Sequence, residues 1–237
     1  MINLKKISLI IPFVKQENIH NLNELFYHIL ENSVLPNEII IITNIKKNKI
    51  LKKSFIVDLK NKNINLKLIF AKKAFPGEAR NLGVNLSKND IIAFLDSQTI
   101  PGDNWLKEGI KILKANKQIV FGSTIYKATN LREKLIKAST YGDKKILTLP
   151  GSIIKKNVFR ITGTFIGKTR SGEDGDWFKR CKLHQIKSGF NPNSLKYIGL
   201  KNLPFKKLIS KWYTYYLASK KLNHLKEQKE IYIVSFL

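Results

Sequence analysis

The stretch that decides the fold is Ile91-Ile92-Ala93-Phe94-Leu95-Asp96-Ser97-Gln98-Thr99-Ile100-Pro101. A short apolar run that is bounded by turn residues is typical of a strand buried on both faces of a sheet. Asp96 then stands at the C-terminal end of this strand, where ligands bind in open α/β sheets. A carboxylate at that place can hold a divalent cation or a sugar hydroxyl. It can also cap the helix that follows, and the stretch alone leaves both interpretations open.

Strands and helices alternate on both sides of this stretch. Apolar runs predict further strands over 7–11, where Pro12 ends the run, and over 38–43, 66–70 and 119–121. Helical spacing of apolar residues predicts helices from about Asn18, over 51–59, after the Pro76-Gly77 turn and over 104–115. The pattern predicts an α/β fold with a mostly parallel, doubly wound sheet flanked by helices. Gly83 lies inside one of these helices, and we expect a close approach of another backbone or of a ligand there.

The second half of the chain is less regular and carries an acidic cluster. We expect helices over 131–141 and 156–161, and a turn over 149–151 that leads into a strand. Glu173, Asp174 and Asp176 then follow Gly172 closely, in a chain that is otherwise basic. These carboxylates suit the N-terminal dipole of a helix. The alternative is that Gly172 frees the backbone to bring a carboxylate into a cleft.

The composition is strongly basic, with 43 Lys and Arg against 17 Asp and Glu among 237 residues and a net charge of +26. Such an excess favours an anionic partner, but the sequence has no recognised nucleic-acid motif, so nucleic acid is not the expected partner. Cys181 is the single cysteine, which excludes an intramolecular disulfide and a thiolate metal site. The sequence has no signal-peptide pattern and no apolar run of about 18 residues. We therefore expect a cytoplasmic protein, at most peripheral at the inner face of the membrane.

The last part of the chain differs in composition. From Pro204 on, lysines alternate with aromatic and aliphatic residues in a helical pattern. We expect one domain over 1–200 and a basic, aromatic helical tail over 201–237. Two interpretations of the tail stay open: it binds an anionic membrane surface, or it packs on the domain.

Taken together, five blocks of the sequence resemble family 2 glycosyltransferases of the GT-A fold, in the order and spacing of that family over about residues 7–180. The blocks are Ser8-Leu9-Ile10-Ile11-Pro12, Glu38-Ile39-Ile40-Ile41-Ile42, Gly77-Glu78-Ala79-Arg80-Asn81-Leu82-Gly83, Ile91 to Pro101, and Gly172-Glu173-Asp174-Gly175-Asp176-Trp177 with Arg180. The resemblance implies a nucleotide-sugar donor, a hydroxyl acceptor in a surface glycan or lipid-linked saccharide, and transfer with inversion at the anomeric carbon.

The resemblance also implies roles for single residues. Asp96 and Gln98 stand where the family has its D-x-D motif, so Asp96 would approach the donor or a Mn²⁺ or Mg²⁺ ion. Gln98 replaces the second carboxylate, and an amide oxygen is a weaker ligand for these cations. Asp174, beside Glu173, matches the family's general base.

Further donor-side positions follow from the same resemblance. Arg80 and Asn81 match its Arg-Asn pair. Pro12 and Asn44 stand where the family lines the base pocket. The residues after the first strand (12–15) and after the second strand (43–46) both depart from the family's pattern, so its common UDP preference is not implied here. Apart from the resemblance, Arg80, Lys168 and Arg170 are candidates to help neutralise the leaving diphosphate, because they lie near the motifs in the sequence.

Three functions other than glycosyl transfer stay open as alternatives. A non-catalytic module that binds sugar nucleotides or glycans is suggested by Gln98. A nucleotidyltransferase would need a glycine-rich loop after the first strand, which the residues after Pro12 do not supply. A basic nucleic-acid binder would show strongly salt-dependent binding.

Overall fold

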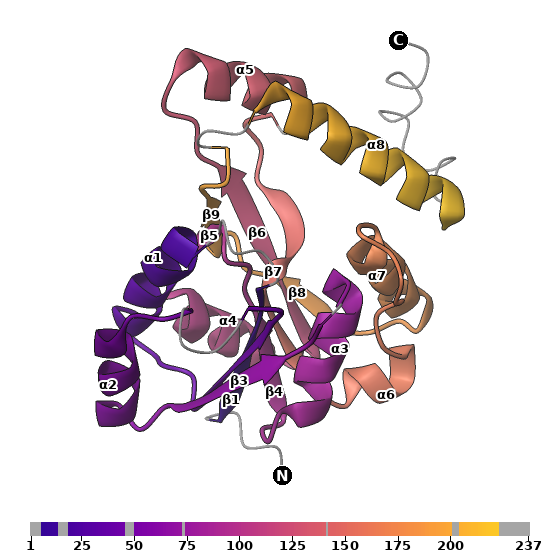
Figure 1. The fold of residues 1–237 in the computed structure, drawn as a ribbon. Coiled ribbons are helices and arrows are strands. Elements are labelled where there is room, and N and C mark those ends of the chain that lie inside the picture. The colour runs from indigo at the N-terminus through magenta and orange to yellow at the C-terminus, as the bar shows by residue number, and fades with distance from the viewer. Residues whose placement is uncertain are drawn as a thin grey trace.

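The first part of the decisive stretch forms a central strand of a nine-stranded mixed sheet in the computed structural model, and its last residues form a short strand at the edge (Figure 1). The structure describes residues 6–13, 19–45, 50–72, 74–140, 142–200 and 204–222. The first half contains β1 (Ile7–Phe13), α1 (Ile19–Leu30), β2 (Glu38–Thr43), α2 (Lys53–Asn61), β3 (Asn65–Phe70), α3 (Pro76–Leu86), β4 (Ile91–Phe94), β5 (Thr99–Pro101) and α4 (Trp105–Lys114). The second half contains β6 (Ile119–Tyr126), α5 (Leu131–Thr140), β7 (Ile146–Lys155), α6 (Val158–Thr162), α7 (Glu173–Leu183), β8 (Ser188–Phe190), β9 (Leu195–Tyr197) and α8 (Phe205–Lys221).

The strand order is β3-β2-β1-β4-β7-β6-β9-β5, and β8 pairs with β6. The first four strands are parallel to one another, whereas β7 runs antiparallel to both β4 and β6. Most strand pairings are parallel, so the predicted α/β fold with a mostly parallel sheet is confirmed. The three-residue strands β5, β8 and β9 were not predicted, since such short segments show no periodicity.

Two predicted boundaries were wrong for local reasons. β1 continues through Pro12, which lies opposite Ile42 of β2. β4 pairs with β1 only as far as Ile10, so Pro12 lies where β1 has a neighbour on one side, and its missing N–H is tolerated there. The expected turn at Pro150-Gly151 lies inside β7, opposite a shift in the β6–β7 register after Val120.

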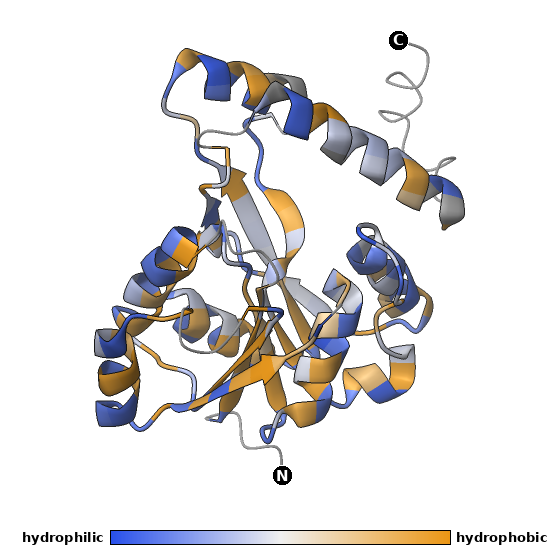
Figure 2. Ribbon diagram, viewed as in Figure 1, coloured by the Kyte–Doolittle hydropathy of each residue, from blue (hydrophilic) through white to orange (hydrophobic). Residues whose placement is uncertain are grey.

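The sheet separates two apolar layers because side chains alternate along each strand. In β1, Leu9 and Ile11 belong to the layer that is covered by α1, α2 and α4, whereas Ile10 belongs to the layer under α3, α6 and α7. In Figure 2 the central strands are mostly hydrophobic, and the helices that flank them carry both hydrophobic and hydrophilic residues. Gly83 of α3 lies against this second layer, where an added Cβ would be 2.5 Å from Ile10 Cγ2. The expected approach of a backbone or ligand is therefore an approach of sheet side chains.

Helices α5 and α8 lie together beyond the end of the sheet, far from the start of β1 (Figure 1). A third, small apolar cluster joins them, in which Ile136, Leu200 and Leu208 are buried and Trp212 packs alongside. The described part of α8 thus packs on the rest of the protein. Residues 201–203 and 223–237 of the predicted tail lie outside the described residues. Among the residues that the structure describes, no helix is long and apolar enough to span a membrane.

Candidate functional site

The site is built at the carboxyl end of β4. The backbone carbonyl of Asp96 accepts hydrogen bonds from the amide and the hydroxyl of Thr99, at 3.1 and 2.6 Å, which forms a tight turn into β5. The turn leaves the Asp96 side chain 41% exposed. The carboxylate can therefore meet a ligand at the edge of the sheet, as its place after a buried strand predicts. The alternative role, a cap of the next helix, is not seen, since Asn104 precedes α4.

Arg80 joins the first half of the site to the second. This side chain of α3 is buried, and its Nη1 donates to Glu173 Oε1 at 2.6 Å. Its Nη2 lies 3.2 Å from Asp96 Oδ1. One guanidinium thus connects the end of β4 to the start of α7, two positions 77 residues apart by number. Three residues that the sequence singled out separately are here in direct contact.

Burial and neighbouring charges shift the pKa values of Arg80 and Glu173. Burial lowers the pKa of Arg80, but the carboxylates of Asp96, Glu173 and Asp174 outweigh it, so the pKa of Arg80 is raised and the cation persists. Burial raises the pKa of Glu173, and Arg80 opposes that shift only in part. Arg80 Nε and Glu173 Oε2 are buried and lack a hydrogen-bond partner among the described residues. A bound water or a polar ligand group is the usual partner of such atoms.

The three acidic residues in the first turn of α7 point to different partners. Gly172 precedes the helix with φ = 84°, a left-handed conformation that favours glycine. Glu173 turns inward to Arg80, whereas Asp176 pairs with Arg180 at 2.7 Å. Asp174 is half-buried, and its Oδ1 accepts the backbone N–H of Gly175 at 2.8 Å. Asp174 is thereby left on the accessible side of the helix start, beside the Arg80 pair.

The first two turns of α3 hold the loop that leads into α7. Asn81 makes two hydrogen bonds to the backbone of Phe165, from its Nδ2 to the carbonyl at 2.7 Å and from the Phe165 amide to its Oδ1 at 2.9 Å. Glu78 Oε1 accepts the Lys168 amide at 3.0 Å. Gly77 faces the carbonyl of Ile166 so closely that an added Cβ would collide with it. The loop therefore rests on α3 along its length.

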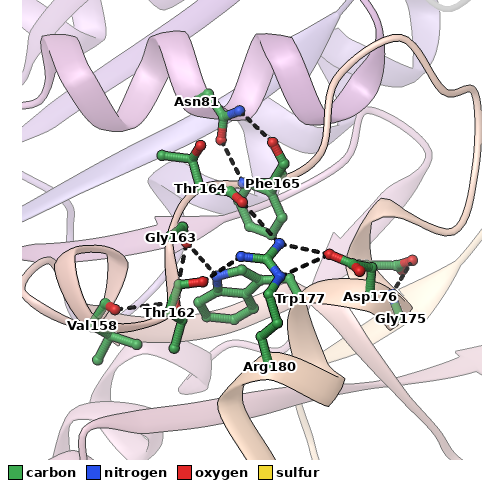
Figure 3. A network of polar contacts seen from close by, with 11 residues as sticks. Asn81, Val158, Thr162, Gly163, Thr164, Phe165, Gly175, Asp176, Trp177 and Arg180 are labelled. Atoms are coloured by element: carbon green, nitrogen blue, oxygen red, sulfur yellow. Dashed lines mark hydrogen bonds and ion pairs between the residues drawn. The ribbon is translucent and has the colours of Figure 1, made fainter. Parts of the chain in front are cut away.

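A second set of contacts fixes the same loop from α7 (Figure 3). Arg180 donates to the carbonyls of Thr162 and Thr164, while Asp176 holds its guanidinium. The buried Trp177 donates from Nε1 to the carbonyl of Gly163 at 3.1 Å. The loop before Glu173 is thus held from both sides, so the position of the acidic cluster is set by packing.

Each predicted site residue now has a place. Asp96, Arg80, Glu173 and Asp174 come together, as described. Pro12 is half-buried near the end of β1, and Asn44 is exposed just after β2, so both lie at the carboxyl edge of the parallel strands. Val14 and Lys15 lie outside the described residues.

Other predicted groups are engaged in local contacts. Both functions of the Asn81 amide bind Phe165, so its contact with a donor stays a prediction. The Arg170 guanidinium carbon lies 5.6 Å from the centre of the Phe75 ring, which holds it over the start of α3. Lys168 is exposed and has φ = 55°. Cys181 is buried, and burial raises the pKa of its thiol to about 12, so it stays neutral and unreactive at pH 7.

Sequence reasoning missed Tyr197. This residue of β9 donates its hydroxyl to Gln98 Oε1 at 2.8 Å, across the antiparallel pair that β9 forms with β5. The only signal for it would have been the pairing of two three-residue strands. The contact bears directly on the residue that replaces the second carboxylate of the D-x-D motif.

The residues present fit poorly to a cation held by protein ligands. The amide oxygen of Gln98 already accepts from Tyr197, and Asp96 Oδ1 is paired with Arg80. Among the described residues, no group of three or more His, Cys, Asp or Glu side chains could hold a metal ion. Hard cations prefer several carboxylate or carbonyl oxygens at once. The side chains at the end of β4 therefore do not form a cation site by themselves.

Comparisons with known proteins agree on the fold. The crystal structure of TarS from S. aureus matches with a TM-score of 0.57 at 14% identity, over 91% of this chain and 39% of TarS. TarS 1–349 in complex with UDP-GlcNAc matches with a TM-score of 0.58 at 12% identity, over 95% of this chain and 70% of that one. The complex of TarS 1–349 with UDP gives 0.56 at 16% identity, over 81% and 60%. This chain thus spans well under half of full TarS.

At these sequence identities the structural match supports the GT-A fold and nothing more specific. No curated protein sequence matches this chain. The sequence model of glycosyl transferase family 2, however, matches residues 8–173, which is more than half of the chain. The matched range includes nearly all of β1, α3 and the Asp96 turn, and it ends at Glu173, one residue before Asp174. The chain belongs to glycosyl transferase family 2.

Proposed function

We propose that this chain transfers a sugar from a nucleotide-sugar donor to a hydroxyl acceptor with inversion at the anomeric carbon. The observation that carries the proposal is the buried Arg80, which binds Asp96 on the donor side and Glu173 at the start of α7. This link fixes a donor-side carboxylate relative to the helix turn that presents Asp174. Transfer needs such a fixed geometry between donor and base.

Asp174 is the proposed general base. An acceptor hydroxyl is a poor nucleophile, and a carboxylate within hydrogen-bond reach can take its proton as the bond to the sugar forms. Asp174 is suited to this step because it is half-buried and accessible, whereas Glu173 is buried against Arg80. Glu173 is then a positioning residue that anchors the first turn of α7.

The donor is proposed to lie along the carboxyl edge of the parallel strands. Pro12 and Asn44 would face the base, and Asp96 would face the ribose or the sugar. Lys168 and Arg170 would counter the charge that develops on the leaving diphosphate. This arrangement does not require a divalent cation held by side chains. UDP-GlcNAc is the first donor to test, because TarS 1–349, which shares the fold, binds it.

The proposal extends to the acceptor and to the cellular location. We infer a glycan or lipid-linked saccharide acceptor, used in the cytoplasm for synthesis of surface polysaccharide.

The experiment measures binding and turnover separately. Nucleotide sugars are screened by thermal shift with and without Mn²⁺, and the best donor is taken into calorimetry and transfer assays with Asp174→Asn and Asp96→Ala. We expect Asp174→Asn to bind donor normally and to lose about 10²–10⁴-fold in transfer. Asp96→Ala should weaken donor binding. Full turnover by Asp174→Asn contradicts the base assignment, and binding without any turnover by the unmodified protein indicates the non-catalytic module.

A further inference from the structure

Helix α8 has two different sides. Leu208 is buried and Trp212 packs beside it on the α5 cluster, and Ala218 is buried further along the same side. On the outer side, Ile209, Tyr213 and Leu217 are exposed. Their spacing of four residues places them in one stripe along the helix. Packing on the protein therefore explains the apolar residues on the inner side of α8 but not those on its outer side.

The neighbouring helix α5 also carries exposed apolar side chains. Leu131 and Leu135 are also four residues apart, and both are exposed, while Ile136 is buried against α8. The five exposed side chains of α5 and α8 range from 46% to 74% exposed. They make up five of the fourteen large apolar side chains that are exposed among the described residues. This concentration on two adjacent helices marks the α5–α8 face as a candidate interaction surface.

The charges around the face are positive. Lys134 of α5 and Lys206 and Lys220 of α8 are exposed. The protein as a whole carries +26, so any large acidic surface would be attracted to it. Tyr213 adds an aromatic side chain of the kind that is enriched where an apolar and an aqueous phase meet. An amphipathic helix with lysines at its border and aromatic residues in its apolar stripe is typical of helices that lie in a lipid interface.

The face also has a defined position relative to the site. Figure 1 shows α8 running from α5 toward the start of α7. At that end, a Cβ added to Gly172 would lie 2.9 Å from Leu222 Cδ1, so the end of α8 touches the residue before Glu173. A surface that binds the outer side of α8 therefore lies across this helix from the residue before Glu173.

We propose that the α5–α8 face docks on a bilayer that contains anionic phospholipid. The apolar stripe enters the interface, and the lysines contact the headgroups. A second copy of this chain is the less favoured occupant, since two faces of equal positive charge repel each other. Docking itself does not depend on the proposed transfer. The role of docking in catalysis does depend on the proposed transfer, because the bilayer would bring a lipid-linked acceptor to the helix whose end contacts the residue before Glu173.

The test is co-sedimentation of the full chain with phosphatidylcholine vesicles, prepared with and without phosphatidylglycerol. The variant Ile209→Ser/Tyr213→Ser/Leu217→Ser removes the stripe, and Ile56→Ser/Val57→Ser/Leu183→Ser removes three exposed apolar side chains elsewhere. We expect binding to the anionic vesicles only, a loss of about tenfold or more in the α8 variant, and unchanged binding in the control. Circular dichroism confirms that both variants are folded, as their exposed positions predict.

Several results would overturn the proposal. These are no sedimentation of the unmodified protein, equal binding to neutral vesicles, or an equal loss in the control variant. A dimer in light scattering that the α8 variant converts to a monomer, without vesicle binding, would assign the face to a second copy. Asp174→Asn should bind vesicles like the unmodified protein, so failure of the proposed transfer and failure of docking are separate outcomes.

Discussion

Arg80 is the residue on which most of the site depends. Its guanidinium is buried between two carboxylates of different elements, so its removal leaves Glu173 buried with an uncompensated charge. We expect Arg80→Met to lower the free energy of unfolding by about 3–5 kcal/mol. Chemical denaturation measures this loss. The double variant Arg80→Met/Glu173→Leu should recover a large part of it, because no lone buried charge remains.

An exposed ion pair provides the control for this prediction. Lys137 and Asp143 are 2.6 Å apart, but the Asp143 side chain is 94% exposed. Water and salt screen such a pair, so Asp143→Asn should leave stability unchanged within error. Strictly additive losses in Arg80→Met and Glu173→Leu would contradict the coupling that the geometry predicts.

Gln98 is the residue at which the dependence of donor binding on a metal ion can be tested. Its amide oxygen is held by Tyr197, and the paired Asp96 is the one nearby carboxylate of the motif. We expect donor binding by the unmodified protein to be nearly equal in Mn²⁺ and in EDTA. Gln98→Asp restores a second carboxylate and should make donor affinity about tenfold higher with Mn²⁺ than with EDTA. Calorimetry with UDP-GlcNAc or UDP measures both.

Tyr197→Phe serves as the control for that variant. It removes the hydrogen bond from the Tyr197 hydroxyl to Gln98 without adding charge, so it should not create a response to Mn²⁺. A strong enhancement by Mn²⁺ in the unmodified protein would show that Asp96 and the diphosphate hold the cation without a second carboxylate, contrary to our prediction.

Helix α3 acts as the platform for the loop before α7, and Gly77 makes the close contact possible. An added Cβ at Gly77 would collide with the Ile166 carbonyl and would make tight contacts with Phe165 and Glu173. We expect Gly77→Ala to displace the loop, to cost about 1–3 kcal/mol of stability and to reduce transfer strongly. Thermal unfolding and the transfer assay measure the two effects.

Gly175 is the matched glycine. It lies in the first turn of α7, where an added Cβ meets nothing within 4 Å. Gly175→Ala should therefore raise stability by about 0.4–1 kcal/mol, because alanine favours the helix and restricts the unfolded chain. A Gly77→Ala protein as stable as Gly175→Ala would show that the loop can move away from α3 freely.

The elements that could be predicted from the sequence are those whose signal is local. Buried strands such as β2 and β4 are recognised by a short unbroken apolar run, and amphipathic helices such as α1 by the helical spacing of their apolar residues. The carboxylates of the site were found because Asp96 follows a strand and Asp174 begins a helix. Contacts between distant segments were not predictable in this way. Asn81 with Phe165 and Gln98 with Tyr197 depend on folded strands and loops that no local pattern encodes.

Across the protein, the relation of α8 to the rest decides how many folding units there are. The predicted boundary near residue 200 separates α8 from the sheet, but Leu208 is buried with Ile136 and Leu200 in one cluster that crosses this boundary. If α8 belongs to the same cooperative unit, Leu208→Ala should lower the free energy of unfolding by about 2–5 kcal/mol within a single transition. Its neighbour Ile209 is 49% exposed, so Ile209→Ala should have an effect within about 0.5 kcal/mol. Denaturation followed by tryptophan fluorescence and by circular dichroism measures both variants, since the fluorescence combines Trp212 of α8 with Trp105 and Trp177, which are buried in the two layers of the domain. Two separate transitions, or equal small effects at both positions, would mean that α8 unfolds on its own and that the face presented to lipid is an appendage instead of part of the domain.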